Sequence, residues 1–337
     1  MNKYIKKIIL LLVTFVFLYF VFRNLNIKEL IIIMKGFKLQ YFILLMISVV
    51  ISHSFRGLCF KTLLSNSVNL PFKEMAPLCM TAGALNVVLP ARAGDFFRAF
   101  FVGQKYGIDK VKVLGTILLE RIFDTLVIFS FLAFGIFFYH RNPLAMKLCT
   151  FAGMAILLAV IFVVVAYKFN NINKICKFIT EKTKKIPFTQ FIEKVIAFIN
   201  KICGSFFNGF EIIDSPKKIA KAIISSSLIW FFECVNFYIV MTGFGLHVHW
   251  SVSLFLIGFI ALACMIPSTS IFIGPYQLAV IAAFAIYGVD KELALSVAFV
   301  DQAGILAANA IVAVIFLFKN NISFKDLKED IKQTEEQ

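Results

Sequence analysis

Long apolar runs separated by short polar breaks cover almost the whole chain. Six of these runs approach or exceed the roughly 20 residues that a helix needs to cross the hydrocarbon core of a bilayer. We therefore expect six membrane-spanning helices, the first of which is short enough to tilt or to end at the interface. Their predicted bounds are residues 8–22, 41–64, 111–138, 144–167, 218–242 and 292–318.

Two further apolar regions, residues 74–105 and 250–289, are interrupted near their centres. The stretch from Pro90 to Gly94 breaks the first, and "PSTSIFIGPY" at 267–276 breaks the second. Proline removes a backbone donor and clashes with the preceding turn, so a regular helix does not continue through it. Each region therefore predicts a hairpin of two short helices, which is re-entrant or barely spans the membrane.

A short sequence recurs after each interrupted region. Tyr106 begins "YGIDK" and Tyr287 begins "YGVDK", and Glu120 and Asp301 each follow 14 residues after those tyrosines. Each copy comes after one span and one broken hairpin, so the repeating unit is span, hairpin, span. The first repeat covers about residues 41–138 and the second about residues 218–318.

The order of the spans predicts that the two repeats are inverted. A hairpin that enters and leaves on one side does not change the side on which the next span begins. The two repeats then start on opposite sides of the membrane, and their hairpins open in opposite directions. Inverted repeats with interrupted helices are typical of transporters, whose binding site lies between the repeats near the midplane.

The composition supports this fold class. The 337 residues are 60% hydrophobic and only 16% charged, whereas soluble globular domains carry about 25% charged residues. We therefore expect an all-α polytopic membrane protein with one transmembrane domain at residues 1–318. A charged cytoplasmic tail is expected at 319–337.

The net charge of +15 fits the excess of Lys and Arg in the cytoplasmic segments of membrane proteins, and we expect no nucleic-acid partner. The N-terminus and the loop at 168–217 are basic, and the tail begins with Lys319, so we expect both termini in the cytoplasm. The helical periodicity within that loop predicts an amphipathic helix on an anionic leaflet. A helix docked on neighbouring spans is the alternative.

The first break carries three charged residues, Arg92, Asp95 and Arg98. Asp95 is predicted to cap the following helix, and Gly94 is predicted to supply flexibility. A helix N-terminus with two guanidinium groups is suited to bind a phosphate, so we expect a lipid headgroup to bind here. The alternative is that both arginines only extend to the cytoplasmic surface. The second break offers Tyr276 and Gln277 in the corresponding position.

Five further charged residues lie within predicted spans, where each charge costs at least about 2.5–3.5 kcal/mol. Glu120 and Asp124 share a helix face and repel each other unless a cation or proton intervenes, whereas Arg121 is spaced to pair with Asp124. We predict that the five residues form a gate or coupling network, and a purely structural ion-pair network is the alternative. They are Glu120, Arg121, Asp124, Glu233 and Asp301.

No motif for enzymatic chemistry is found. The sequence has no phosphate-binding loop of the type that binds ATP. His247 and His249 alone provide too few ligands for a metal site. We therefore expect no catalytic residue, no metal and no cofactor.

The charged motifs resemble those of the lysylphosphatidylglycerol synthase/flippase transmembrane-region family. "N-x-x-x-P-x-R-x-G-D" at 86–95, which begins with Asn86, and "ERIFD" at 120–124 resemble its first half. The second half departs from the family pattern "P-S-x-P-G-F-I-G-x-x-E", because Ser270, Ile271 and Gln277 replace its proline, glycine and acid. The resemblance implies that Asn86 belongs to the binding site, and the departures put the substrate in doubt.

The resemblance implies that, in bifunctional relatives, the membrane domain translocates a lipid that a separate synthase domain makes. No such domain is expected here, so we predict a non-enzymatic flippase of the bacterial or archaeal cytoplasmic membrane that moves an anionic or phosphate-bearing lipid. The alternative is an accessory subunit or enzyme component of lipid or polyprenyl-glycolipid synthesis. The predicted partners are the lipid, an anionic leaflet, and a second copy of the chain or a lipid-synthesis enzyme.

Overall fold

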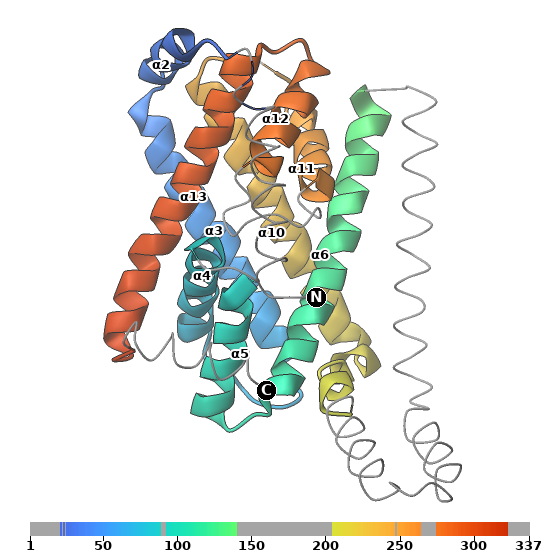
Figure 1. Cartoon of the computed structure of the whole chain (residues 1–337). Coiled ribbons are helices and arrows are strands. Elements are labelled where there is room, and N and C mark those ends of the chain that lie inside the picture. Colours follow the sequence, from blue (N-terminus) through green and yellow to red (C-terminus); the bar gives the residue numbers. More distant parts are fainter. Residues whose placement is uncertain are drawn as a thin grey trace, which may run out of the picture.

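The computed structural model of the chain describes residues 21, 23, 25–88, 92–139, 204–246, 248–263 and 274–322 (Figure 1). Within these ranges it contains nine α-helices and one 3₁₀ helix, and no strand. The predicted all-helical class is confirmed for the part of the chain that is described.

The helices follow the order long, short, short, long, and this order occurs twice. The first set is α3 (Leu39–Leu63), α4 (Phe72–Val88), α5 (Ala93–Tyr106) and α6 (Lys110–Tyr139). The second set is α10 (Pro216–Gly243), α11 (Ser251–Ala263), α12 (Pro275–Ala285) and α13 (Lys291–Lys319). Two smaller elements complete the fold, α2 (Ile27–Lys35) and the 3₁₀ helix η2 (Glu211–Asp214).

Four of the predicted spans correspond to the long helices, with bounds that differ by at most two residues. Three of these, α3, α10 and α13, are long and apolar enough to cross a membrane. The predicted spans 8–22 and 144–167 lie outside the described residues, apart from Val21. Most of the loop 168–217 and the tail after Ile322 lie outside them as well. Helix α2 was not predicted; Asn26 Oδ1 caps it by accepting a hydrogen bond from the Glu29 backbone N–H.

The two predicted hairpins are present as pairs of short helices. Helices α11 and α12 have 13 and 11 residues, and at about 1.5 Å per residue neither crosses a ~30 Å hydrocarbon core. Helices α4 and α5 have 17 and 14 residues. The break between α4 and α5 agrees with the prediction, and most of the break between α11 and α12, at 264–273, lies outside the described residues.

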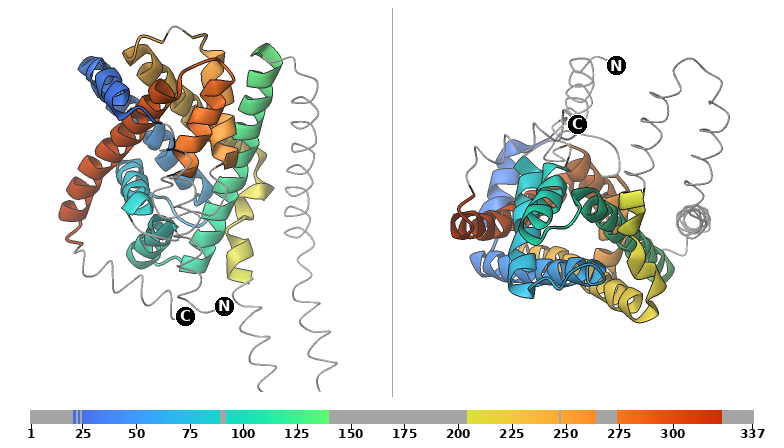
Figure 2. Two further views of the ribbon diagram at one scale, coloured as in Figure 1. Left: turned by 45° about the horizontal axis from the view of Figure 1, so that its top comes forward. Right: turned by 90° about the horizontal axis from the view of Figure 1, so that it is seen from below.

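The two sets of helices pack in a reciprocal way. Helices α3 and α10, the first of each set, pack along each other. Helix α4 packs against α13, and α11 packs against α6, so the first short helix of each set contacts the last long helix of the other. In Figure 1, α4 and α5 lie in the lower half and α11 and α12 in the upper half. Helix α6 runs upward in this view and α13 runs downward, and the two further views in Figure 2 agree with this placement.

The outer faces of the long helices are apolar. Helix α3 exposes Ile43, Ile47 and Ile51, which are spaced by four and therefore lie on one face. Helix α13 exposes Ile311 and Ile315 in the same way. Contiguous apolar surface of this kind is unfavourable in water and indicates contact with lipid. The fold is therefore that of a protein whose outer surface lies within a membrane.

Candidate functional site

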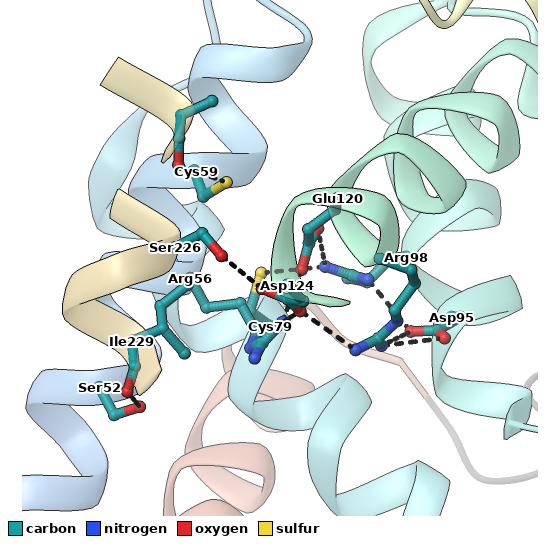
Figure 3. A network of polar contacts seen from close by, with 12 residues as sticks. Ser52, Arg56, Cys59, Cys79, Asp95, Arg98, Glu120, Asp124, Ser226 and Ile229 are labelled. Carbon is teal, nitrogen blue, oxygen red and sulfur yellow. Dashed lines mark hydrogen bonds and ion pairs between the residues drawn. The ribbon is translucent and has the colours of Figure 1, made fainter. Parts of the chain in front are cut away.

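Three arginines and three carboxylates meet where α3, α5 and α6 approach one another (Figure 3). Residues three or four apart on a helix share a face, so α5 and α6 each present their charged residues to the same side. The members are Arg56 of α3, Asp95 and Arg98 of α5, and Glu120, Arg121 and Asp124 of α6. We call these six residues the ion-pair ring.

Two arginines hold three carboxylates in the ring. Arg56 Nη1 lies 2.8 Å from Glu120 Oε1 and 3.0 Å from Asp124 Oδ2. Arg98 uses two nitrogens, with Nη1 3.0 Å from Glu120 Oε2 and Nη2 3.1 Å from Asp95 Oδ1. Both oxygens of Glu120 are therefore bound, each by a different arginine.

Arg121 completes the ion-pair ring. Its Nη2 lies 3.2 Å from both oxygens of Asp95, and its Nη1 lies 3.6 Å from Asp124 Oδ2. Each charge in the ring consequently has two neighbours of opposite sign. The 3.6 Å separation is longer than a hydrogen bond, which makes the contact between Arg121 and Asp124 the loosest of the six.

The ring is buried on one side and accessible on the other. The side chains of Arg98 and Glu120 are 1% and 0% exposed, whereas that of Arg121 is 31% exposed. The Arg98 guanidinium also lies 4.9 Å from the centre of the Phe60 ring, which covers it. Arg121 is therefore the most accessible member of the ring.

Neighbouring polar groups make further contacts with the ring. Ser226 of α10 donates a hydrogen bond to Asp124 Oδ1 at 2.8 Å, and Arg98 Nη1 lies 3.6 Å from Cys79 Sγ of α4. The Nε groups of Arg98 and Arg121 are buried and donate to no atom of the described residues. Two donors thus remain for a ligand or water.

The turn before α5 brings this helix close to α4. A Cβ atom at Gly94 would lie 1.9 Å from the carbonyl oxygen of Ala82, so only glycine permits this approach. In this structure Gly94 therefore serves close packing, and its predicted flexibility stays a prediction. Asn86 Oδ1 accepts a hydrogen bond from the Gly94 N–H at 2.8 Å, which uses the Asn86 side chain within the fold.

The prediction that Asp95 caps α5 is wrong. The residue at the N-cap is Arg92, which adopts a left-handed conformation with φ of 55° and makes no side-chain cap bond. Asp95 lies within the first turn, and its carboxylate belongs to the ring, because the two arginines of the ring bind it more strongly than a backbone N–H does. Arg92 is exposed at the start of α5, and Pro90 lies outside the described residues.

Arg56 is the member of the ring that sequence analysis missed. It lies within the predicted span 41–64, so the rule that intramembrane charges are functional or paired would have selected it. Arg56 also explains how Glu120 and Asp124 can lie on the same helix face without repelling each other. The cation that separates these two carboxylates is the guanidinium of Arg56.

Glu233 of α10 lies beside the ring and not within it. Its Oε1 accepts a hydrogen bond from Ser52 at 2.8 Å, and its Oε2 accepts one from Asn236 at 3.2 Å. Ser52 precedes Arg56 by four residues on α3, so Glu233 is about one helical turn from the ring.

The second set of helices repeats the contact between a short helix and the following long helix. Tyr276 of α12 donates a hydrogen bond to Asp301 Oδ2 of α13 at 2.5 Å, and Gln277 Nε2 donates to Gln302 at 2.7 Å. Gln277 Oε1 accepts from the Gly274 N–H, which fixes the start of α12. Sequence analysis paired Glu120 with Asp301, and each lies ten residues after the first residue of its helix.

The predicted site residues therefore form two groups in the structure. Asp95, Arg98, Glu120, Arg121 and Asp124 meet in the ring, with Glu233 next to it. Tyr276, Gln277 and Asp301 form a separate cluster between α12 and α13, which contains two neutral polar residues and one acid. With Arg56 added, the ring holds three cations and three anions, whereas the second group contains no cation.

Several buried polar atoms in the long helices lack a hydrogen-bond partner among the described residues. Such atoms require water, an ion or a ligand, because an unsatisfied polar group in a buried site is costly. They include Ser48 Oγ, Asn236 Oδ1, Asp301 Oδ1 and Asn309 Oδ1. Within the described ranges, no group of three or more His, Cys, Asp and Glu side chains could hold a metal ion.

Long apolar helices, lipid-facing outer surfaces and a buried ion-pair ring define a multi-pass membrane protein with a polar site within its helix bundle. The family comparison is more specific. A family profile described as lysylphosphatidylglycerol synthase TM region matches residues 7–313, and the chain belongs to this family. Neither a curated protein nor a solved structure matches the chain.

Proposed function

We propose that the protein is a flippase that moves an anionic or phosphate-bearing lipid between the leaflets of the cytoplasmic membrane. The observation that carries this proposal is the ion-pair ring, with one buried side and one accessible side. Membership of the lysylphosphatidylglycerol synthase TM region family connects the fold to membrane lipids. On this proposal the chain transports a lipid and does not modify it.

The helix order supports an inverted repeat as the basis of transport. Helix lengths, the reciprocal packing of α4 on α13 and of α11 on α6, and the opposite directions of α6 and α13 all support a two-fold rotation in the membrane plane as the relation between the two sets. Gly107 and Gly288 occupy matched positions and share left-handed conformations, with φ of 68° and 69°. Repeats of this kind support alternating exposure of a site between them.

The ring is suited to act as a gate because an anion can replace one of its own carboxylates. A phosphate that reaches Arg121 would compete with Asp124 for Nη1 and would find an additional donor at Nε. Arg92, exposed at the start of α5 and three residues before Asp95, would add a further positive charge near the ring. Charge-assisted and bidentate contacts of arginine with phosphate are strong enough to offset the lost ion pair.

The second cluster offers a path without fixed positive charge. Once past the ring, an anionic headgroup would meet the hydroxyl of Tyr276, the amide of Gln277 and the unpartnered buried atoms of α10 and α13. Neutral donors bind a phosphate less tightly than guanidinium groups do. This asymmetry would allow release of the lipid, and Asp301 would repel an anion that returned.

Reconstitution tests the proposal directly. The purified protein is placed in vesicles that contain a trace of fluorescent phosphatidylglycerol, and a membrane-impermeant reductant destroys the label in the outer leaflet. Protein-dependent loss of label from the inner leaflet, with or without an imposed ion gradient, is expected. Arg121→Glu should reduce this loss at least tenfold, while Lys217→Glu, at an exposed position of α10 away from the ring, should not.

The alternative function is an accessory role in lipid or polyprenyl-glycolipid synthesis. It predicts that the reconstituted protein moves no lipid under any gradient, and that lipid product forms only when a partner enzyme is added. That result, obtained with folded wild-type protein, would overturn the flippase proposal.

A further inference from the structure

A cavity of about 660 Å³ lies at the end of the bundle between α4, α5 and α13, away from the ion-pair ring. In Figure 1, α13 ends at the lower left of the molecule, and α4 and α5 lie in the same lower half. None of the residues that line it belongs to the ring or to the cluster around Asp301. Its volume falls within the range of roughly 300–1,000 Å³ that is usual for small-molecule sites.

One side of the cavity is basic. Lys73 of α4, Lys105 of α5 and Lys319 of α13 line it together with a single acidic residue, Glu74. Glu74 pairs with Lys105 and also accepts a hydrogen bond from the Tyr106 hydroxyl, so its charge is already neutralised. Within the described part of the chain, Lys73 and Lys319 have no ion-pair partner, and both are exposed. Among the described residues, these two positive charges are therefore not compensated by an acid.

The other side of the cavity is apolar. Val312, Ile315 and Phe316 of α13 form this side, and Ile315 is 62% exposed. Phe316 packs against Phe101 of α5 with ring centres 5.2 Å apart, which joins the long helix to the short helix beneath the cavity. An apolar surface that leads up to two ammonium groups at the end of a membrane helix matches a lipid more closely than a soluble anion.

We propose that this cavity binds one anionic membrane phospholipid. The phosphate lies between Lys73 and Lys319, and the first part of one acyl chain lies along Val312 and Ile315. Lysine side chains near the membrane surface attract anionic headgroups, and their methylene groups cover neighbouring apolar surface. The site is peripheral and separate from the ring, so it is occupied whether or not the protein transports lipid.

Lipid retention measured by native mass spectrometry tests this site. Protein in mild detergent is supplied with an equimolar mixture of phosphatidylglycerol and phosphatidylcholine, and the lipid bound to each protein species is identified. The wild type is expected to retain one phosphatidylglycerol preferentially. Each lysine close to an anionic surface corresponds to roughly a fivefold change in binding, so Lys73→Glu with Lys319→Glu should lower this retention at least about tenfold.

Two control variants distinguish the loss of this site from other causes of reduced lipid retention. Lys217→Glu with Lys221→Glu makes the same charge change at exposed positions on α10, outside the cavity, and should leave retention unchanged. Val312→Trp should fill the apolar side and reduce retention of phosphatidylglycerol while preserving both lysines. Thermal unfolding of each variant in detergent establishes that it is folded.

Three outcomes would overturn the proposal. Equal retention in the cavity variant and in the α10 control would show that the lysines only add general positive charge. Equal retention of phosphatidylglycerol and phosphatidylcholine by the wild type would reveal an unselective apolar groove. Displacement of the lipid by millimolar inorganic phosphate would identify a site for a soluble anion. The flippase assay is read separately, so its failure does not affect these results.

Discussion

At the scale of single residues, the arginines of the ion-pair ring are not equivalent. Arg56 contacts Glu120 and Asp124 through one nitrogen, Nη1, which lies between them. Arg98 contacts Glu120 and Asp95 through two different nitrogens. A lysine ammonium is a single point of positive charge, so it can reproduce the first arrangement and not the second.

We therefore expect two arginine-to-lysine substitutions in the ring to differ in cost. Arg98→Lys should lower the free energy of unfolding by about 1–3 kcal/mol, because one buried carboxylate loses its hydrogen bond. Arg56→Lys should cost less than about 1 kcal/mol, since both contacts can be kept. Unfolding of the purified variants by sodium dodecyl sulfate in mixed micelles measures both values. Equal costs would contradict the geometry of the ring.

A second prediction concerns Tyr276, whose hydroxyl is the hydrogen-bond partner of Asp301. Tyr276→Phe removes this donor without changing the packing volume and leaves the carboxylate with no partner among the described residues. We expect lipid movement in the vesicle assay to fall several-fold while the protein remains folded. Tyr238→Phe, at a 41% exposed position of α10, is the matched control and should retain full activity.

Sequence reasoning identified five of the six ring residues because charged residues stand out in apolar spans. It missed Arg56, although the same rule applied to it, because both partners of Arg56 lie on α6, far away in the sequence. It misassigned Asp95 for a physical reason. A carboxylate near a helix start suits a cap, and only the three-dimensional approach of α6 shows that Arg121 competes for it.

At the scale of helices, the position of α5 depends on its close approach to α4. The Cβ of any larger residue at 94 would meet the carbonyl oxygen of Ala82, which is backbone and cannot rotate away. Because α5 carries Asp95 and Arg98, displacement of this helix would also open the ion-pair ring. The packing of two short helices thus controls the geometry of the site.

Gly94→Ala should therefore be far more harmful than an alanine substitution usually is. We expect a loss of about 1–3 kcal/mol in the free energy of unfolding from the forced backbone shift, together with loss of lipid movement. Gly83→Ala on α4 is the control, because its Cβ would meet only the ends of the Asn309 and His53 side chains, at 3.1 and 3.4 Å. The control should retain most of its stability and activity. A Gly94→Ala variant as stable and active as Gly83→Ala would contradict this account.

The helix bounds were predictable because an apolar segment within a membrane can adopt few backbone structures. A single apolar segment can satisfy all of its own backbone polar groups within lipid only as a helix, so the length of an apolar run predicts a membrane span. The reciprocal packing of α4 on α13 and of α11 on α6 was not predicted. It depends on which helix faces meet, and faces that are apolar all round carry no directional signal.

At the scale of the whole molecule, the proposed inverted repeat can be tested by chemical labelling. Gln104 at the end of α5 and Ala285 at the end of α12 occupy matched positions, and both are exposed. Single cysteines are placed at these positions after the seven native cysteines have been replaced. In intact cells, a membrane-impermeant maleimide should react with only one of the two, and both should react after the membrane is permeabilised.

The topology would be wrong if both positions were labelled in intact cells or both were protected. In those cases the two hairpins would open to the same side, and alternating exposure by the proposed symmetry would not be available. The basic ends of α3 and α10 favour the cytoplasm for the position on α5, so Ala285→Cys is expected to be the labelled variant.

The equal number of positive and negative charges in the ring has an electrical consequence. Moving one elementary charge through the full membrane field requires about 2.3 kcal/mol per 100 mV, whereas three arginines and three carboxylates that move together carry no net charge through it. The empty gate should therefore open and close at the same rate in energised and de-energised cells. Only the headgroup that passes through it would make the cycle respond to voltage.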